Sequence, residues 1–112
     1  FPIRVVFTPD GTLVTSRSTH HGHDEIAAFF RAARAGDDSD KRHFVCQPHI
    51  HSTDDGLVTL DCYFTYIARG VESMLGWGTY TAAIRTDSGR ALFASLTVSV
   101  HLGTDLFRGW RR

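Results

Sequence analysis

The stretch 57–67 reads LVTLDCYFTYI, and its side chains alternate between two kinds. The even positions are apolar (Val58, Leu60, Cys62, Phe64 and Tyr66), whereas the odd positions carry Thr59, Asp61, Tyr63 and Thr65. Such alternation is typical of a strand in an antiparallel sheet with one face in the core. We therefore predict a strand whose even-numbered side chains face the interior.

Further strands are expected on both sides of this stretch. We predict strands over 42–51, 72–85 and 92–102, with turns at 53–56 and 86–89. Pro48 cannot donate to a ladder, so it predicts an edge strand or a bulge. In the last strand, the even-numbered side chains from Leu92 to Leu102 are expected to face inward, and the odd-numbered side chains from Phe93 to His101 are expected to face outward. Upstream, the sequence predicts a turn at Thr8–Gly11, a short strand at 12–15 and a loop at 16–23.

One helix is predicted between the upstream segment and the long strands. Ile26, Phe29, Phe30 and Ala33 follow the i, i+3, i+4, i+7 spacing of a single apolar stripe, and Gly36 ends it. Strands this long twist and curl, which lets them wrap a concave face around a helix. The predicted fold class is α+β, a curved antiparallel sheet wrapped around one main helix with a cavity between them.

Size, charge and cysteine usage limit the classes of function. The 112 residues suit one domain, 1–112, and the 12 basic and 12 acidic residues cancel, which argues against a nucleic-acid partner. No apolar run reaches the roughly 18 residues of a membrane span. We interpret Cys46 and Cys62 as buried reduced thiols, which favours a cytoplasmic location. The chain starts without methionine, so we expect it to begin part-way into a domain.

Several short motifs occur in a characteristic order. They are Val6-Phe7-Thr8-Pro9-Asp10-Gly11, Gly22-His23-Asp24-Glu25-Ile26, Arg42-His43-Phe44, Cys62-Tyr63-Phe64 and Gly78-Thr79-Tyr80. In this order the chain resembles the nuclear transport factor 2-like superfamily in its SnoaL-like branch, and is similar to scytalone dehydratase and to β subunits of ring-hydroxylating dioxygenases. The resemblance implies a cone-shaped α+β barrel around a pocket for a small apolar or aromatic molecule, and a homodimer through the sheet. It also implies that the family's first helix is missing, which makes this an amino-terminally truncated SnoaL-like domain.

The same resemblance assigns candidate site residues. His43 matches the histidine that serves dehydratases as an acid/base, and Tyr66 and Tyr80 match pocket-facing positions. We expect His43 to be buried in a pocket lined by Phe30, Cys62, Phe64, Ala82, Leu96 and Val98. Two positions depart from the family pattern, because Ala82 stands where relatives often have Asp or Asn, and Ala68 where dehydratases have a second histidine.

Two functions stay open at this point. In the first, the protein is a cofactor-independent dehydratase, isomerase or cyclase in which His43 moves a proton. In the second, the cavity is filled by side chains and the domain is a non-catalytic dimerisation or assembly module. His43 would then be a core histidine bonded to a carbonyl or a tyrosine hydroxyl.

Other polar and aromatic residues are interpreted more simply. His20-His21-x-His23 and His49-x-His51 have metal-like spacing, but neither includes cysteine, so we interpret them as solvent-exposed histidines and predict no metal site. Asp61 is assigned to the outer face. No glycine-rich phosphate loop occurs, so no cofactor is predicted. Large aromatics facing outward usually mark an interface, so Trp77 and Phe93 are assigned to the dimer contact.

Overall fold

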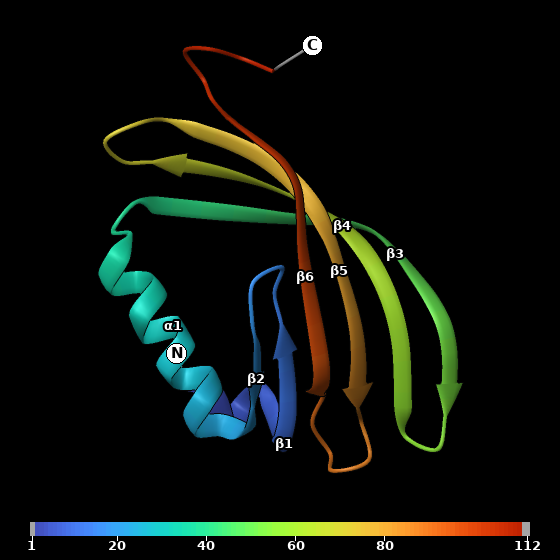
Figure 1. Ribbon diagram of the computed structural model, residues 1–112. Helices are drawn as coiled ribbons and strands as arrows, with labels where there is room; N and C mark the ends of the chain where they lie inside the picture. Colours follow the sequence, from blue (N-terminus) through green and yellow to red (C-terminus); the bar gives the residue numbers. More distant parts are fainter. Residues whose placement is uncertain (1, 111–112) are drawn as a thin grey trace.

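A computed structural model describes residues 2–110 as a six-stranded, open sheet that curves around one main helix (Figure 1). A short 3₁₀ helix, η1 (Ile3–Val5), comes first. The remaining elements are β1 (Phe7–Val14), β2 (Thr19–His21), α1 (Gly22–Gly36), β3 (Asp40–Asp54), β4 (Leu57–Arg69), β5 (Met74–Arg85) and β6 (Leu92–Asp105). The strand order in the sheet is β2-β1-β6-β5-β4-β3, which makes β3 an edge strand.

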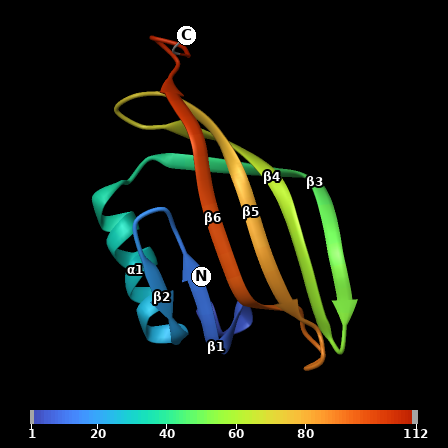
Figure 2. The same cartoon turned by 45° about the vertical axis from the view of Figure 1, so that its right-hand side comes forward.

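The four long strands match the sequence prediction; β3, β4 and β6 run a few residues further, whereas β5 starts at Met74, two residues later than predicted. Strands β3 to β6 pair antiparallel with their sequence neighbours, and they bend together so that their concave face looks toward α1 (Figures 1 and 2). The β3–β4 turn is the two-residue loop Asp55-Gly56, and both residues have positive φ. This conformation is that of a type I′ hairpin turn, which glycine at the second position favours.

The amino-terminal part differs from the prediction. Thr8–Gly11 was predicted as a turn but lies inside β1, where an irregularity between Phe7 and Thr12 absorbs the extra residues. Part of the predicted loop forms β2. Strand β1 pairs with β6 in parallel, so the sheet is mixed and not wholly antiparallel as predicted. Alternation cannot reveal this, because parallel pairing depends on which strands the chain brings together.

The hydrophobic core lies between α1 and the β1–β6 side of the sheet. Ile26 of α1 is completely buried and packs with Ile3, Phe7 and Leu13. The helix contacts η1, β1 and β2. No helix in the described chain is long and apolar enough to cross a membrane. Partly buried residues surround this core, namely Val6, Ala27, Phe29, Phe30, Phe93, Leu96 and Val98.

Phe93 corrects one prediction, because it faces the core and not the outer surface. Its ring centroid lies 5.5 Å from that of Phe7. The cause is a bulge in the β5–β6 ladder, where Ala83 pairs with Ser95 but Ile84 pairs with Phe93. One additional β6 residue is inserted there, and it reverses the sides to which the neighbouring side chains point.

The edge strand β3 carries the irregularity that Pro48 predicts. The β3–β4 register shifts between Cys46 and His49, and Gln47 has a positive φ of 53°. Edge position and bulge are therefore both confirmed. Cys46 is exposed here, contrary to its assignment as a buried thiol, whereas Cys62 of the neighbouring strand β4 is buried; both thiols are free.

Candidate functional site

The concave face brings His43 of β3 together with Tyr80 of β5. The Nδ1 atom of His43 lies 2.8 Å from the Tyr80 hydroxyl oxygen, which is hydrogen-bond distance. The two strands are not neighbours, because β4 lies between them. The two side chains therefore meet over β4, whose Phe64 ring stacks with both of them.

Three aromatic rings stack in this region. The ring of His43 is nearly parallel to that of Phe64, with an interplanar angle of 9° and centroids 5.5 Å apart. Phe64 in turn stacks on Tyr80 with centroids 4.3 Å apart. Tyr66 stands 5.9 Å from His43 by ring centroids. We call His43, Phe64, Tyr66 and Tyr80 the inner aromatic cluster.

Glycines in the adjoining strands make room for the cluster. A Cβ on Gly76 would come within 2.2 Å of the Tyr66 ring, and one on Gly103 within 2.6 Å of its hydroxyl oxygen. These two residues face each other across the β5–β6 ladder. Gly76 and Gly103 thus leave the space that the Tyr66 side chain occupies.

Partial burial keeps the hydrogen-bonded pair of His43 and Tyr80 uncharged near neutral pH. Desolvation, and secondarily the charge of Lys41, lowers the pKa of His43 below its ordinary 6.5. Desolvation also raises the pKa of Tyr80, with a smaller contribution from Cys62. The pair is therefore a neutral imidazole and a protonated phenol that share one hydrogen bond. Because Nδ1 makes that bond, Nε2 is the nitrogen left for a ligand.

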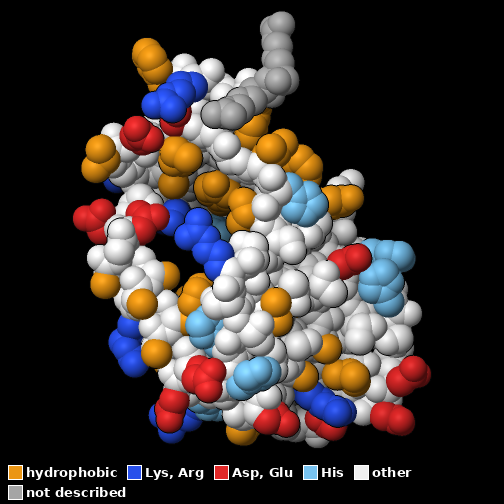
Figure 3. All heavy atoms as spheres, in the orientation of Figure 1, with side chains coloured by type: hydrophobic (Ala, Val, Ile, Leu, Met, Phe, Trp, Pro, Cys, Tyr) orange, Lys and Arg blue, Asp and Glu red, His pale blue; other side chains and the backbone are white. Residues whose placement is uncertain are grey.

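The His43 side chain points in the expected direction, but contrary to the prediction it is not buried. Its side chain lies on the concave face, but the residue is exposed. The helix packs on η1, β1 and β2, away from the edge strand to which His43 belongs. Figure 3 shows the molecule hollowed between the helix and the sheet, so this part of the concave face is open.

A hollow of about 480 Å³ adjoins the inner aromatic cluster at Tyr66. It lies between the end of α1 and strands β4 and β5, and Ala68 and Met74 belong to its wall. Lys41 stands at its rim in an ion pair with Asp37. This hydrogen-bonded pair holds the pKa of Asp37 well below its usual range. The hollow is within the ~300–1,000 Å³ range of small-molecule sites.

Comparison with known proteins identifies the family. The family model for the SnoaL-like domain matches residues 2–97. The chain belongs to the SnoaL-like domain family. No curated protein matches this SnoaL-like chain.

Solved structures share the fold at low sequence identity. Hexachlorocyclohexane dehydrochlorinase LinA-type3 from Novosphingobium barchaimii superposes with a TM-score of 0.80 at 14% identity, covering 96% of this chain and 76% of that one. A candidate scytalone dehydratase from Novosphingobium aromaticivorans gives 0.77 at 14% identity, with 95% and 72% covered. ActVI-ORFA from Streptomyces coelicolor gives 0.72 at 18% identity, with 84% and 76% covered. These likenesses show the nuclear transport factor 2-like α+β fold that the sequence predicted.

The remaining residues assigned to the SnoaL-like pocket divide into two groups. Cys62 and Ala82 are buried on the sheet beside the inner aromatic cluster. Cys62 pairs with Tyr80 across the β4–β5 ladder, and Ala82 pairs with Leu96 across the β5–β6 ladder. Phe30, Leu96 and Val98 instead pack against the core that contains Ile26. Sequence alternation placed the sheet residues on the correct face. It did not show that the helix lies nearer to β1 than to β3.

Sequence reasoning also missed a polar grouping on the outer face. Asp61 of β4 lies beside His49 and His51 of β3. The two histidines were treated as isolated, because their partner comes from the neighbouring strand. The signal available in the sequence was the hairpin turn at 53–56, which places Asp61 roughly opposite the pair. The histidines of the other motif are hydrogen-bonded, His20 with Ser18, His21 with Thr12 and His23 with the Phe7 carbonyl. His21 is exposed as predicted, whereas His20 and His23 are partly buried.

Proposed function

We propose that this SnoaL-like domain binds a small apolar or aromatic molecule at the inner aromatic cluster and the adjoining hollow. The observation that carries the proposal is the His43–Tyr80 hydrogen bond of 2.8 Å above the Phe64 ring. Stacked rings provide an apolar surface, and a neutral imidazole and a phenol add two polar contacts. Small-molecule sites are typically lined by apolar and aromatic side chains with a small number of polar groups.

The chemistry that suits this pair is proton transfer. When Nδ1–H donates to the Tyr80 oxygen, the neutral imidazole of His43 can accept a proton from carbon or oxygen at Nε2. Tyr66 can donate a hydrogen bond to a ligand oxygen from the wall of the hollow. The reaction class we propose is dehydration, isomerisation or a related elimination. Two of the similar structures, the dehydrochlorinase and the candidate scytalone dehydratase, are named for this class of chemistry.

A thermal-shift screen tests binding. Small aromatic and polyketide-like compounds are added to the wild-type chain, to His43→Ala and to His101→Ala. His101 is a matched control, because it is an exposed histidine that bonds to Thr79 on β5 and lies outside the cluster. We expect at least one compound to raise the unfolding temperature of the wild type and of the control, but to have little effect on His43→Ala. If no compound stabilises the wild type, the ligand proposal fails.

The outer face supports a second candidate function, a dimerisation or assembly module. Trp77 pairs with Leu102 on one side and with Thr65 on the other, and Thr65 pairs with Phe44. Phe44, Trp77 and Leu102 are exposed, as are Tyr63 and Ile67 of β4. Leu102 was expected to face inward, but the register shift between Trp77 and Gly78 in the β5–β6 ladder turns it to the outer face. An exposed apolar patch of this kind favours an interface, here a homodimer through the sheet.

Analytical ultracentrifugation tests the assembly function directly. The double variant Trp77→Ser, Leu102→Ser should be monomeric where the wild type is dimeric. Phe107→Ser is the control, because Phe107 is exposed outside the sheet. A wild type that is monomeric at high concentration counts against this function. Dimerisation by itself is compatible with a ligand at the inner aromatic cluster, because the two use opposite faces of the sheet, whereas a non-catalytic module with a filled cavity is not.

A further inference from the structure

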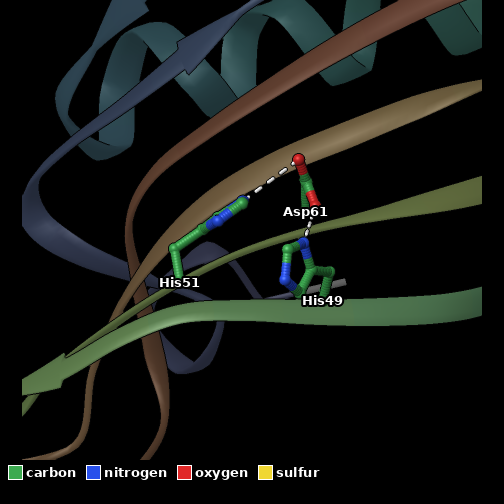
Figure 4. Close-up of side chains that lie close together, drawn as sticks. All are labelled: His49, His51 and Asp61. Carbon is green, nitrogen blue, oxygen red and sulfur yellow. Dashed lines mark ion pairs between the residues drawn. The ribbon is translucent and has the colours of Figure 1, made fainter.

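The β3–β4 hairpin gathers two imidazoles and one carboxylate on the sheet face opposite the inner aromatic cluster. His51 Nε2 lies 3.1 Å from one carboxylate oxygen of Asp61, and His49 Nδ1 lies 3.9 Å from the other. The imidazole rings meet nearly edge to face with centroids 4.5 Å apart. Figure 4 shows the three side chains converging from the two strands.

Two irregularities in β3 bring the histidines to this position. The register shifts between Cys46 and His49, so that His49 pairs directly with Asp61. It shifts again between Ile50 and Ser52, which makes His51 the additional residue of a bulge. A bulge redirects a side chain relative to the regular pleat. Bulges on both sides of His49 thus bring His51 to the same carboxylate that faces His49.

We infer that His49, His51 and Asp61 form a binding site for a divalent transition-metal ion, for which Zn²⁺ is the reference ion. Their ligand atoms all lie within 4.8 Å of one another. Zinc holds imidazole nitrogens and carboxylate oxygens at about 2.0–2.2 Å, so neighbouring ligands in a tetrahedral site are roughly 3.4 Å apart. Small rotations of the exposed imidazoles close the remaining difference.

The donor set fixes the class of ion. Imidazole nitrogen suits zinc, copper, nickel and iron, whereas calcium and magnesium prefer oxygen ligands alone. Two histidines and one carboxylate leave at least one coordination position for water or a further ligand, as in catalytic zinc sites. The site is therefore an open one, separate from the inner aromatic cluster and independent of the proposed function.

The solvent exposure of the three ligand side chains determines how strongly the site is expected to bind the ion. The side chains of His49, His51 and Asp61 are 74%, 47% and 45% exposed. Strong metal sites hold their ligands with further hydrogen bonds from surrounding groups. Within the described residues, the two histidines are hydrogen-bonded or ion-paired only to Asp61. We therefore expect weaker binding than in a zinc site whose ligands are held by surrounding groups.

Isothermal titration of tag-free, chelator-treated protein with zinc chloride tests the site. We expect one ion per chain in the wild type. Asp61→Asn and His51→Ala should each weaken binding at least about tenfold, because each removes a direct ligand. His101→Ala should leave the affinity within about twofold. Far-UV circular dichroism and unfolding temperature, both measured without metal, verify that the variants keep the fold.

Cobalt provides a second readout that reports position. Co²⁺ should produce visible absorption bands in the wild type that are lost in Asp61→Asn and in His51→Ala. It should also broaden the NMR signals of the β3–β4 hairpin. Equal zinc affinity in the wild type and in folded Asp61→Asn and His51→Ala would overturn the proposed site. A ratio of one ion to two chains would also overturn it, in favour of an ion shared between copies.

Discussion

His43 and Tyr80 are hydrogen-bonded across an intervening strand, with Nδ1 of the imidazole 2.8 Å from the phenol oxygen. Strand β4 separates their backbones, and its Phe64 side chain stacks with both rings. The bond is therefore supported from below by a buried ring and is open to solvent above. This arrangement positions an imidazole without a carboxylate partner.

Replacing Tyr80 by phenylalanine tests the bond itself. Tyr80→Phe keeps the stacking on Phe64 but removes the hydroxyl, so the free energy of unfolding should fall by about 0.5–1.5 kcal/mol. Tyr63→Phe is the matched control, because Tyr63 is exposed on the outer face of β4. Urea unfolding measures both. An unchanged stability in Tyr80→Phe would show that the bond contributes nothing to the fold.

Phe64 supports the cluster and should be the member most costly to truncate. It is 2% exposed, so Phe64→Ala removes a fully packed ring and should cost about 3–5 kcal/mol. Phe107 is 98% exposed, and Phe107→Ala should change stability by less than about 0.5 kcal/mol. Similar losses in the two variants would contradict the packing described for β4.

Gly76 tests whether Tyr66 needs the space that the glycine leaves. In Gly76→Ala the new methyl group meets the Tyr66 ring, so the ring must move at a cost of about 1–3 kcal/mol. Gly36→Ala should be neutral or stabilising by up to about 1 kcal/mol, because no atom beyond its own helix and chain neighbours lies within 4 Å of the added carbon. The NMR chemical shifts of Tyr66 and His43 should change in the first variant alone.

The lowered pKa of His43 predicts a pH dependence. Since desolvation depresses the folded-state pKa below 6.5, the unfolded chain takes up this proton at a higher pH than the folded chain does. The resulting contribution to stability is complete above about pH 6.5 and is lost as the pH falls through the folded-state pKa. His43→Gln should flatten stability against pH in this window. The change is small, because solvent screens an exposed group, and an identical slope in both proteins would contradict it.

Much of the sheet was predictable because alternation and turn chemistry act locally. The pattern of 57–67 correctly placed Cys62 and Phe64 inside and Tyr63 outside. The Asp55-Gly56 pair similarly determined the hairpin turn. The inward direction of His43 came from the family resemblance, and its contact with Tyr80 agrees with that expectation.

The structure differs from the sequence prediction mainly where one additional residue shifts the pairing between two strands. The bulge near Ala83 turned Phe93 inward, and the bulges in β3 brought His49 and His51 to Asp61. A bulge moves side chains to the other face without changing the sequence pattern that predicts a strand. The exposure of His43 was also unpredictable, because it depends on which strands the helix covers.

The most direct test of the central claim is an NMR titration of ¹⁵N- and ¹³C-labelled protein with the compounds that stabilise it most in the thermal-shift screen. We predict that the chemical-shift changes concentrate on His43, Tyr66 and Tyr80 and on the residues around the adjoining hollow, and that His43→Ala abolishes them. Changes confined to the outer face of the sheet, or the same changes in His43→Ala, would contradict a ligand site at the inner aromatic cluster.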